Sequence, residues 1–346
     1  MAIPYSRTIF GGLPWYSVLV VGGIVLAIWL AGREEKRLGL PKDTAVDLAL
    51  VVVPCGIVGA RLYYVVMSWP QFAQNPLSVL YVWQGGLAIY GGVIGGAVGA
   101  WCCSRHKKIS FASVADMIAP GLLLAQAVGR WGNYFNMEAY GPLIQDARLQ
   151  FFPFGVLIPV NGVYQWHMAA FFYESVWNLC SFIVLWLIRK RQTVRGNVFC
   201  WYLVFYGSGR FVIEQLRQDS LYIGSLRASQ WLSLILCLTA ACILIMRTTH
   251  ARKDRRFLAV ICLILWLSRW FFLDQPLVYG VLLVASGAMA TGLVWRRWTF
   301  GVLAAMLVLD GAGLALSAAG WSLAACVQPL LCSITLAGYL LSVCVK

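Results

Sequence analysis

Three charged residues near position 214 have the spacing of a single helix face. Arg210, Glu214 and Arg217 are separated by four and three residues, and they follow the apolar run FCWYLVFYGSG. Side chains at these intervals lie on the same side of a helix. One interpretation is a salt-bridged stripe at a membrane surface. Because Arg210 directly follows an apolar segment, we favour the alternative that its guanidinium is buried or lines a cavity.

A second polar cluster also follows an apolar run. The stretch GRWGNYFNMEAYG, residues 129–141, comes directly after GLLLAQAV and contains Arg130, Asn133, Asn136 and Glu138. Two arginines from distant segments, Arg130 and Arg210, suit a phosphate because the planar guanidinium group matches phosphate oxygens. Ionisable residues in or beside membrane helices are costly and usually functional. Those outside the basic loops are Arg61, Asp116, Arg130, Glu138, Glu174, Arg210, Glu214 and Arg217.

The composition predicts a polytopic, all-α integral membrane protein. The chain has 346 residues, of which 61% are hydrophobic and 12% are charged, whereas soluble domains carry about 25% charged residues. Several apolar runs approach the roughly 20 residues needed to cross a bilayer. The net charge of +14 comes from short basic clusters between these runs. Such clusters orient membrane helices, so we do not expect nucleic-acid binding.

The helix pattern predicts a seven-helix core and about four additional C-terminal helices. Basic clusters follow the odd-numbered helices of the core, which places the N-terminus outside and the C-terminus in the cytoplasm. We therefore expect a core at residues 1–256 with an outer cap at about 129–168, and an appended transmembrane extension at 257–346. The expected core helices cover residues 15–31, 46–67, 86–103, 111–128, 169–188, 196–211 and 231–246.

The glycine-rich stretch GGLAIYGGVIGG, residues 85–96, has two interpretations. Small residues at this spacing permit tight helix packing. Alternatively, they mark a broken or re-entrant helix beside a cavity, in which case the hydroxyl of Tyr90 would point at the site. The 11 cysteines and three histidines show no metal-ligand spacing, so we expect no metal.

Taken together, these stretches resemble the prolipoprotein diacylglyceryl transferase family. Residues 129–141 are similar to its signature, approximately GRxGNFxNxExxG, through Arg130, Gly132, Asn133, Asn136, Glu138 and Gly141. The resemblance covers about 230 residues and ends near residue 250. Supporting matches are GLPWYSV at 12–18, GARLYYV at 59–65, GGLAIYGGVIGG at 85–96, ADMIAP at 115–120, FYES at 172–175 and YGSGRFVIEQLR at 206–217.

The chain departs from the family pattern in three places. Many members carry a histidine in the middle of the GG…GG motif, where this chain has Tyr90. The family's HPxQLYES stretch appears here as HMAAFFYES, which leaves His167 without an assigned role. The predicted helices after residue 257 are not part of the usual seven-helix architecture, and their role is open.

The resemblance implies a lipid-transfer enzyme of the bacterial cytoplasmic (inner) membrane. Its members transfer the diacylglyceryl group of phosphatidylglycerol to the lipobox cysteine of a preprolipoprotein signal peptide, and they use no cofactor. The expected catalytic residues are Arg130, Arg210, Glu138, Glu214 and Tyr90. Expected substrate-binding residues are Arg130, Asn133, Asn136, Gly141, Tyr16, Tyr206, Arg61 and Arg217. The base that deprotonates the thiol is left open between Tyr90, a carboxylate and the cationic field itself.

Two other classes of function remain as alternatives. Glycine-broken helices and intramembrane charges also occur in transporters, although the sequence shows no convincing duplication of its first half. A non-catalytic family member that binds a lipid or a partner is the other alternative.

Overall fold

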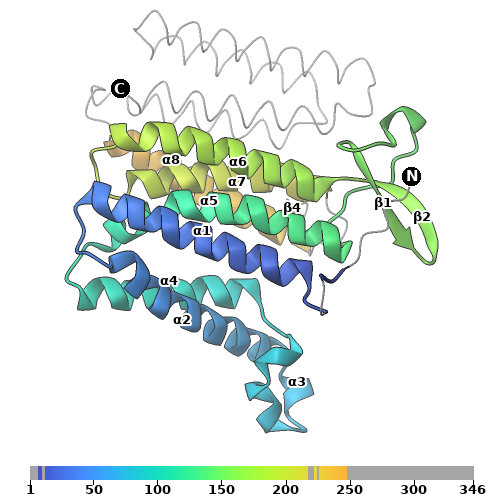
Figure 1. The fold of residues 1–346 in the computed structure, drawn as a ribbon, viewed down its shortest axis with the longest axis horizontal. Coiled ribbons are helices and arrows are strands. Elements are labelled where there is room, and N and C mark those ends of the chain that lie inside the picture. Colours follow the sequence, from blue (N-terminus) through green and yellow to red (C-terminus); the bar gives the residue numbers. More distant parts are fainter. Residues whose placement is uncertain (1–6, 10–11, 217–221, 224–225, 248–346) are drawn as a thin grey trace, which may run out of the picture. The chain divides into compact units, whose positions relative to one another are not determined.

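The computed structural model describes residues 7–9, 12–216, 222–223 and 226–247, which form helices and two short antiparallel hairpins (Figure 1). Arg217 and the predicted extension at residues 257–346 lie outside the described residues. The long helices are α1 (Trp15–Leu38), α2 (Thr44–Met67), α4 (Ile89–His106), α5 (Phe111–Asn136), α6 (Ala170–Ile188), α7 (Asn197–Leu216) and α8 (Ala228–Arg247). The shorter elements are α3 (Trp69–Phe72), η1 (Pro76–Leu80), η2 (Val82–Gln84), η3 (Ala147–Leu149), η4 (Arg189–Arg191), β1 (Gly155–Val160), β2 (Val163–Met168), β3 (Tyr222–Ile223) and β4 (Leu226–Arg227).

The helical, membrane-spanning character predicted from the sequence agrees with the structure. Each of the seven expected core ranges overlaps one of the long helices. In the described part of the chain, four helical segments are long and apolar enough to cross a membrane, namely Trp15–Leu38, Thr44–Met67, Phe111–Asn136 and Ala170–Arg191. The total number of spans and the orientation of the termini stay predictions.

The described residues divide into two compact units. One unit comprises the residues up to Gly23 and those from Leu123 onward, and the other comprises Ile24–Leu122. Helices α1 and α5 contribute residues to both. The core of the second unit is built from small and aliphatic side chains, namely Ala31, Ala45, Leu48, Ala100, Cys103, Val114 and Met117.

Helices α2 and α4 of the second unit pack closely through glycines. A Cβ atom on Gly59 would lie 2.5 Å from the carbonyl oxygen of Gly91, and one on Gly91 would overlap the carbonyl oxygen of Gly59. Helix α4 is continuous from Ile89 to His106. The tight-packing interpretation of residues 85–96 is therefore confirmed, and the helix is not broken after Ile89. Gly85 and Gly86, which have φ values of 87° and 69°, precede the helix.

Helix α5 is longer than the sequence analysis predicts. The expected helix ends at residue 128, but the observed helix continues to Asn136 and includes most of the signature stretch. No proline interrupts these residues, and Gly132 leaves room for Tyr16, whose Cδ2 atom would be 2.8 Å from a Cβ at that position. Arg130 and Asn133 therefore extend from a helix and not from a loop.

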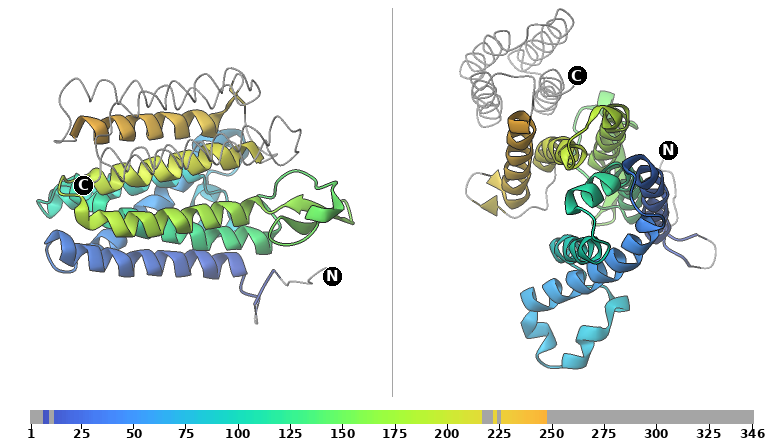
Figure 2. Two further views of the ribbon diagram at one scale, coloured as in Figure 1. Left: turned by 90° about the horizontal axis from the view of Figure 1, so that it is seen from above. Right: turned by 90° about the vertical axis from the view of Figure 1, so that its left-hand side faces the viewer.

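A β-hairpin occupies much of the segment that the sequence analysis describes as a polar outer cap. Strands β1 and β2 pair in antiparallel register from Gly155–Met168 to Val160–Val163. Asn161 and Gly162 form the turn with φ values of 52° and 82°, as expected for a two-residue Asn-Gly hairpin. The hairpin projects beyond the ends of α5 and α6 (Figures 1 and 2), and His167 lies in β2.

Candidate active site

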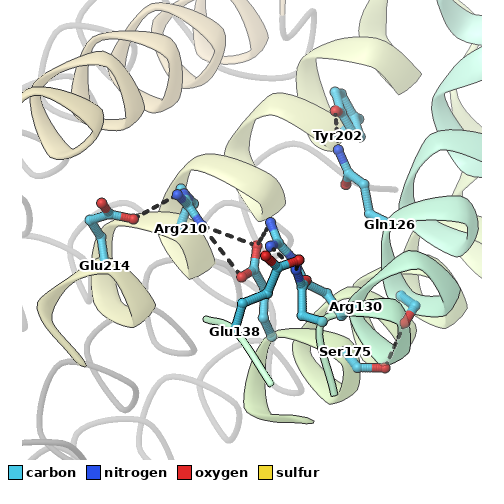
Figure 3. Close-up of polar contacts among 10 residues, drawn as sticks. Gln126, Arg130, Glu138, Ser175, Tyr202, Arg210 and Glu214 are labelled. Carbon is cyan, nitrogen blue, oxygen red and sulfur yellow. Dashed lines mark hydrogen bonds and ion pairs between the residues drawn. The ribbon is translucent and has the colours of Figure 1, made fainter. Parts of the chain in front are cut away.

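Two arginines from different helices meet at one carboxylate. The Nη2 atom of Arg130, on α5, lies 2.6 Å from Oε1 of Glu174, on α6. The Nη1 atom of Arg210, on α7, lies 3.4 Å from Oε2 of the same glutamate (Figure 3). Glu174 is only 4% exposed. The guanidinium groups that the sequence analysis singles out are thus held around a buried anion within one compact unit.

Glu214 forms a second ion pair at this cluster. Its Oε2 atom lies 2.7 Å from Nη2 of Arg210, one helical turn away on α7. Glu214 is buried. The spacing of four residues therefore places a glutamate and an arginine on one face of α7, as the sequence predicts, and the ion pair restrains the orientation of the arginine.

The asparagines of the signature stretch connect Arg130 to Glu138. Asn133 accepts a hydrogen bond of 3.4 Å from Nη1 of Arg130 and donates one of 2.9 Å to Oε1 of Glu138. Asn136 donates a second bond of 3.2 Å to the same oxygen. Arg130, Asn133, Asn136 and Glu138 form one hydrogen-bonded network, in which Glu138 is the exposed residue.

A left-handed turn after α5 carries Glu138 back toward the helix. Met137 and Ala139 both have φ values of 56°, a conformation that residues other than glycine rarely adopt. The backbone N–H of Glu138 donates to the carbonyl of Asn133 at 3.0 Å, which satisfies one of the free carbonyls at the helix end. Such strain often accompanies functional sites.

The far end of the signature is attached to the β-hairpin. The N–H of Gly141 donates to the carbonyl of Met168 at 2.8 Å, and Nδ1 of His167 lies 2.9 Å from the carbonyl oxygen of Gly141. A carbonyl only accepts, so Nδ1 carries the hydrogen. His167, which has no role in the sequence analysis, therefore anchors the end of the signature, and Gly141 supplies backbone atoms for this contact.

Hydrogen bonds from tryptophan and serine side chains connect the three helices that carry the ionic cluster. Trp131 of α5 donates to Ser175 of α6 at 3.2 Å, and Ser175 donates to the carbonyl of Ala127 at 2.8 Å. Trp177 of α6 donates to the carbonyl of Phe205 of α7 at 2.8 Å. These bonds connect α6 both to α5, which carries Arg130, and to α7, which carries Arg210.

Arg61, a predicted substrate-binding residue, holds a loop in the structure. Its guanidinium donates to the carbonyls of Ser78, Val79, Gly85 and Gly86 at 2.6–3.1 Å, and the residue is 6% exposed. These bonds engage all three nitrogens and tie the connection between α2 and α4 to α2. Its predicted contact with substrate stays a prediction.

Replacing Arg61 with lysine is expected to loosen residues 76–86. A single ammonium group cannot reach four carbonyls from a planar fork, so buried acceptors would lose their partners. Hydrogen exchange of the detergent-solubilised protein should show at least tenfold faster exchange in this segment and an unchanged rate in α7. Equal exchange in both proteins would contradict the loop-holding role.

The predicted tyrosines fall into both compact units. Tyr16 contacts Gly132 beside the signature stretch, and Tyr206 stacks on Tyr202 with ring centroids 5.8 Å apart. Tyr206 lies one turn from Arg210 on α7. Tyr90 belongs to the unit of Ile24–Leu122 and is 47% exposed, so its predicted role near the arginines stays a prediction.

Glu174 is the functional candidate absent from the predicted site. In the sequence it is one of the ionisable residues in or beside membrane helices, but it has no role in the predicted site. Its signal is a carboxylate in the first turns of a long apolar helix, within the motif FYES. The bridging carboxylate is determined by the packing of α5, α6 and α7. The sequence alone does not show that Glu174, and not another glutamate, contacts both arginines.

Comparison with known proteins identifies the family of the chain. A family model described as prolipoprotein diacylglyceryl transferase matches residues 7–246. The chain belongs to the prolipoprotein diacylglyceryl transferase family. The match includes the whole ionic cluster and leaves the residues after 246 outside the family region.

Curated relatives from several bacteria carry the same family name. A protein of Enterococcus faecalis named phosphatidylglycerol–prolipoprotein diacylglyceryl transferase is 45% identical over 245 residues, which cover 68% of this chain and 87% of the relative. Relatives of the same name from Bacillus cereus (strain Q1) and Bacillus anthracis are each 42% identical, and the alignments cover 70% of this chain and 91% of each relative.

Proposed function

We propose that this chain transfers the diacylglyceryl group of phosphatidylglycerol to the lipobox cysteine of a prolipoprotein signal peptide, forming a thioether and releasing glycerol 1-phosphate. The observation that carries the proposal is the convergence of Arg130 and Arg210 on Glu174 in a chain that belongs to this transferase family. A phosphate diester carries one negative charge, and two guanidinium groups around one buried position offer a matching site.

The arginines would act on the bond-breaking step. As the carbon–oxygen bond of the lipid breaks, negative charge accumulates on the phosphate group. Preorganised cations at that position lower the barrier because they need not reorient during the reaction. The ion pair with Glu214 supports this role because it restrains the guanidinium of Arg210 from the adjacent turn of α7.

The exposed end of the signature suits the glycerol head group. Glu138 presents carboxylate oxygens that accept hydrogen bonds, and Asn133 and Asn136 hold it in place. The free glycerol of phosphatidylglycerol carries hydroxyl donors next to its phosphate. We assign Glu138 to these hydroxyls, with Tyr16, Gly141 and Tyr206 as further residues of the lipid site. Tyr90 and Arg217 stay predicted participants.

The setting of the proposed reaction is the bacterial inner membrane. Phosphatidylglycerol and the signal peptide would both reach the site from within the bilayer, consistent with the apolar character of α5 and α6, which carry Arg130 and Glu174. We place the signature stretch and the β1–β2 hairpin at the outer face, following the positive-inside pattern of the basic loops. Residues 257–346 would form an appended transmembrane unit.

A lipid-transfer assay tests the proposed function directly. The full chain in phosphatidylglycerol vesicles, labelled in the diacylglyceryl group, should attach the label to a lipobox peptide and release glycerol 1-phosphate in equal amount. A peptide with serine in place of the cysteine should remain unlabelled. Failure to label the cysteine peptide would contradict the enzyme, and solute uptake without lipid transfer would favour the transporter alternative.

A further inference from the structure

The ionic cluster already contains an anion where the lipid phosphate is proposed to bind. Arg130 and Arg210 provide two positive charges, and Glu174 and Glu214 provide two negative charges at 2.6–3.4 Å from them. Glu174 is the carboxylate that joins the two arginines. A phosphate that binds between the two guanidinium groups would compete with Glu174 for Nη2 of Arg130 and Nη1 of Arg210.

Displacement by the phosphate would leave Glu174 in an unfavourable state. Its side chain is buried among α5, α6 and α7, where an ionised carboxylate without cationic partners is strongly disfavoured. Protonation removes the charge and hence the penalty. Binding of the lipid would thus convert Glu174 from an ion-pair partner into a proton acceptor.

The transfer reaction supplies one proton at this stage. A cysteine thiol is a poor nucleophile until it becomes a thiolate, and the sequence analysis leaves the base open. We propose that Glu174 is the catalytic residue that accepts the thiol proton, after the lipid phosphate has replaced it on Arg130 and Arg210. This inference rests on the proposed function and adds an order of events to it.

The step balances in atoms and charge. The thiol proton moves to a carboxylate oxygen of Glu174, and the sulfur forms a bond to the carbon of the diacylglycerol backbone that carries the phosphate. The carbon–oxygen bond breaks, and its electron pair remains on the phosphate as glycerol 1-phosphate. When this product leaves, Glu174 releases its proton to water and pairs again with the two arginines, which restores the resting cluster.

Replacing Glu174 with glutamine separates this role from a structural one. Glutamine keeps the size of the side chain and a carbonyl oxygen for the arginines, but it does not accept the proton. The transfer rate should fall by about 10²–10⁴-fold, the usual contribution of general-base catalysis. Binding of glycerol 1-phosphate should be as tight as in the unaltered protein or tighter, because a competing negative charge is gone. Weakened binding together with lost transfer would indicate a structural role and overturn the proposal.

A selenocysteine lipobox peptide provides the rescue experiment. A selenol is largely ionised at neutral pH, so it needs no base when kept reduced. The Glu174→Gln variant should transfer lipid to this peptide at a rate within tenfold of the unaltered chain. The matched control is Glu214→Gln, which removes the same charge from the same cluster, and its transfer should not be rescued. Lack of rescue for Glu174→Gln would overturn the proposal.

The outcomes distinguish this inference from the proposed function. No transfer by the unaltered chain would contradict the function itself. Normal transfer by both the unaltered chain and Glu174→Gln with the cysteine peptide would retain the function and overturn the role of Glu174.

Discussion

Replacement of Arg130 by alanine is expected to lower the rate of diacylglyceryl transfer by at least 10²–10³-fold, the usual loss for one preorganised donor to a developing charge. The change also removes the nearer cationic partner of Glu174, at 2.6 Å. The negative charge of Glu174 would then be balanced by one arginine fewer and would repel the incoming phosphate more strongly. Lipid binding should therefore weaken as well. Transfer from labelled phosphatidylglycerol measures the rate, and glycerol 1-phosphate binding measures the affinity.

Arg130→Lys is the matched control for this loss. Lysine keeps the positive charge but not the planar pair of donors, so its rate should fall between those of the unaltered chain and the alanine variant. Arg210→Ala should resemble Arg130→Ala, because both arginines contact Glu174. Membrane insertion of each variant is checked by protease accessibility. Near-normal transfer by both alanine variants would rule out the paired arginines as the phosphate site.

Replacement of Gly91 by alanine is expected to destabilise the packing of α2 against α4 by about 1–3 kcal/mol, the usual cost of overpacking. A Cβ atom at this position would overlap both the carbonyl oxygen of Gly59 and the Cβ atom of Tyr63. Backbone cannot move away as a flexible side chain can, so the helices must separate. The midpoint of thermal unfolding in detergent should fall.

Gly96→Ala is the matched control on the same helix. A Cβ atom there would lie 3.5 Å from Cγ1 of Val52, which is ordinary van der Waals contact. Because alanine favours helix by up to about 1 kcal/mol over glycine, this variant should be as stable as the unaltered chain or more stable. A lower midpoint for Gly96→Ala than for Gly91→Ala would contradict the close contact of α2 and α4.

The sequence predicts the helices well because each depends on local apolar composition. It fails where an element depends on partners elsewhere in the chain. Helix α5 continues past residue 128 to Asn136, and in this part Gly132 contacts Tyr16, which is far away in the chain. The hairpin around Asn161 and Gly162 is the exception, since its Asn-Gly turn is a local signal that the sequence analysis overlooks.

The sequence predicts which residues belong to the candidate site better than it predicts the ion pairs and hydrogen bonds between them. Arg130 and Arg210 are recognisable because each follows an apolar run. Their shared carboxylate is not recognisable, since Glu174 becomes the bridge only when α6 packs against both α5 and α7. For Arg61 the sequence predicts a contact with substrate where the structure shows a contact with a loop. Its sequence context resembles that of a site residue, but its donors bind four backbone carbonyls, which no side-chain pattern reveals.

The loop bonds of Arg61 have a consequence for biogenesis. Between Asp47 and Arg105, Arg61 is the sole charged residue of the chain, and the carbonyls that it binds belong to the same α2–α4 hairpin. The hydrogen-bonding requirement of this charge is therefore met without any later helix. We expect α2, α4 and the segment between them to form these bonds before any later helix has been synthesised.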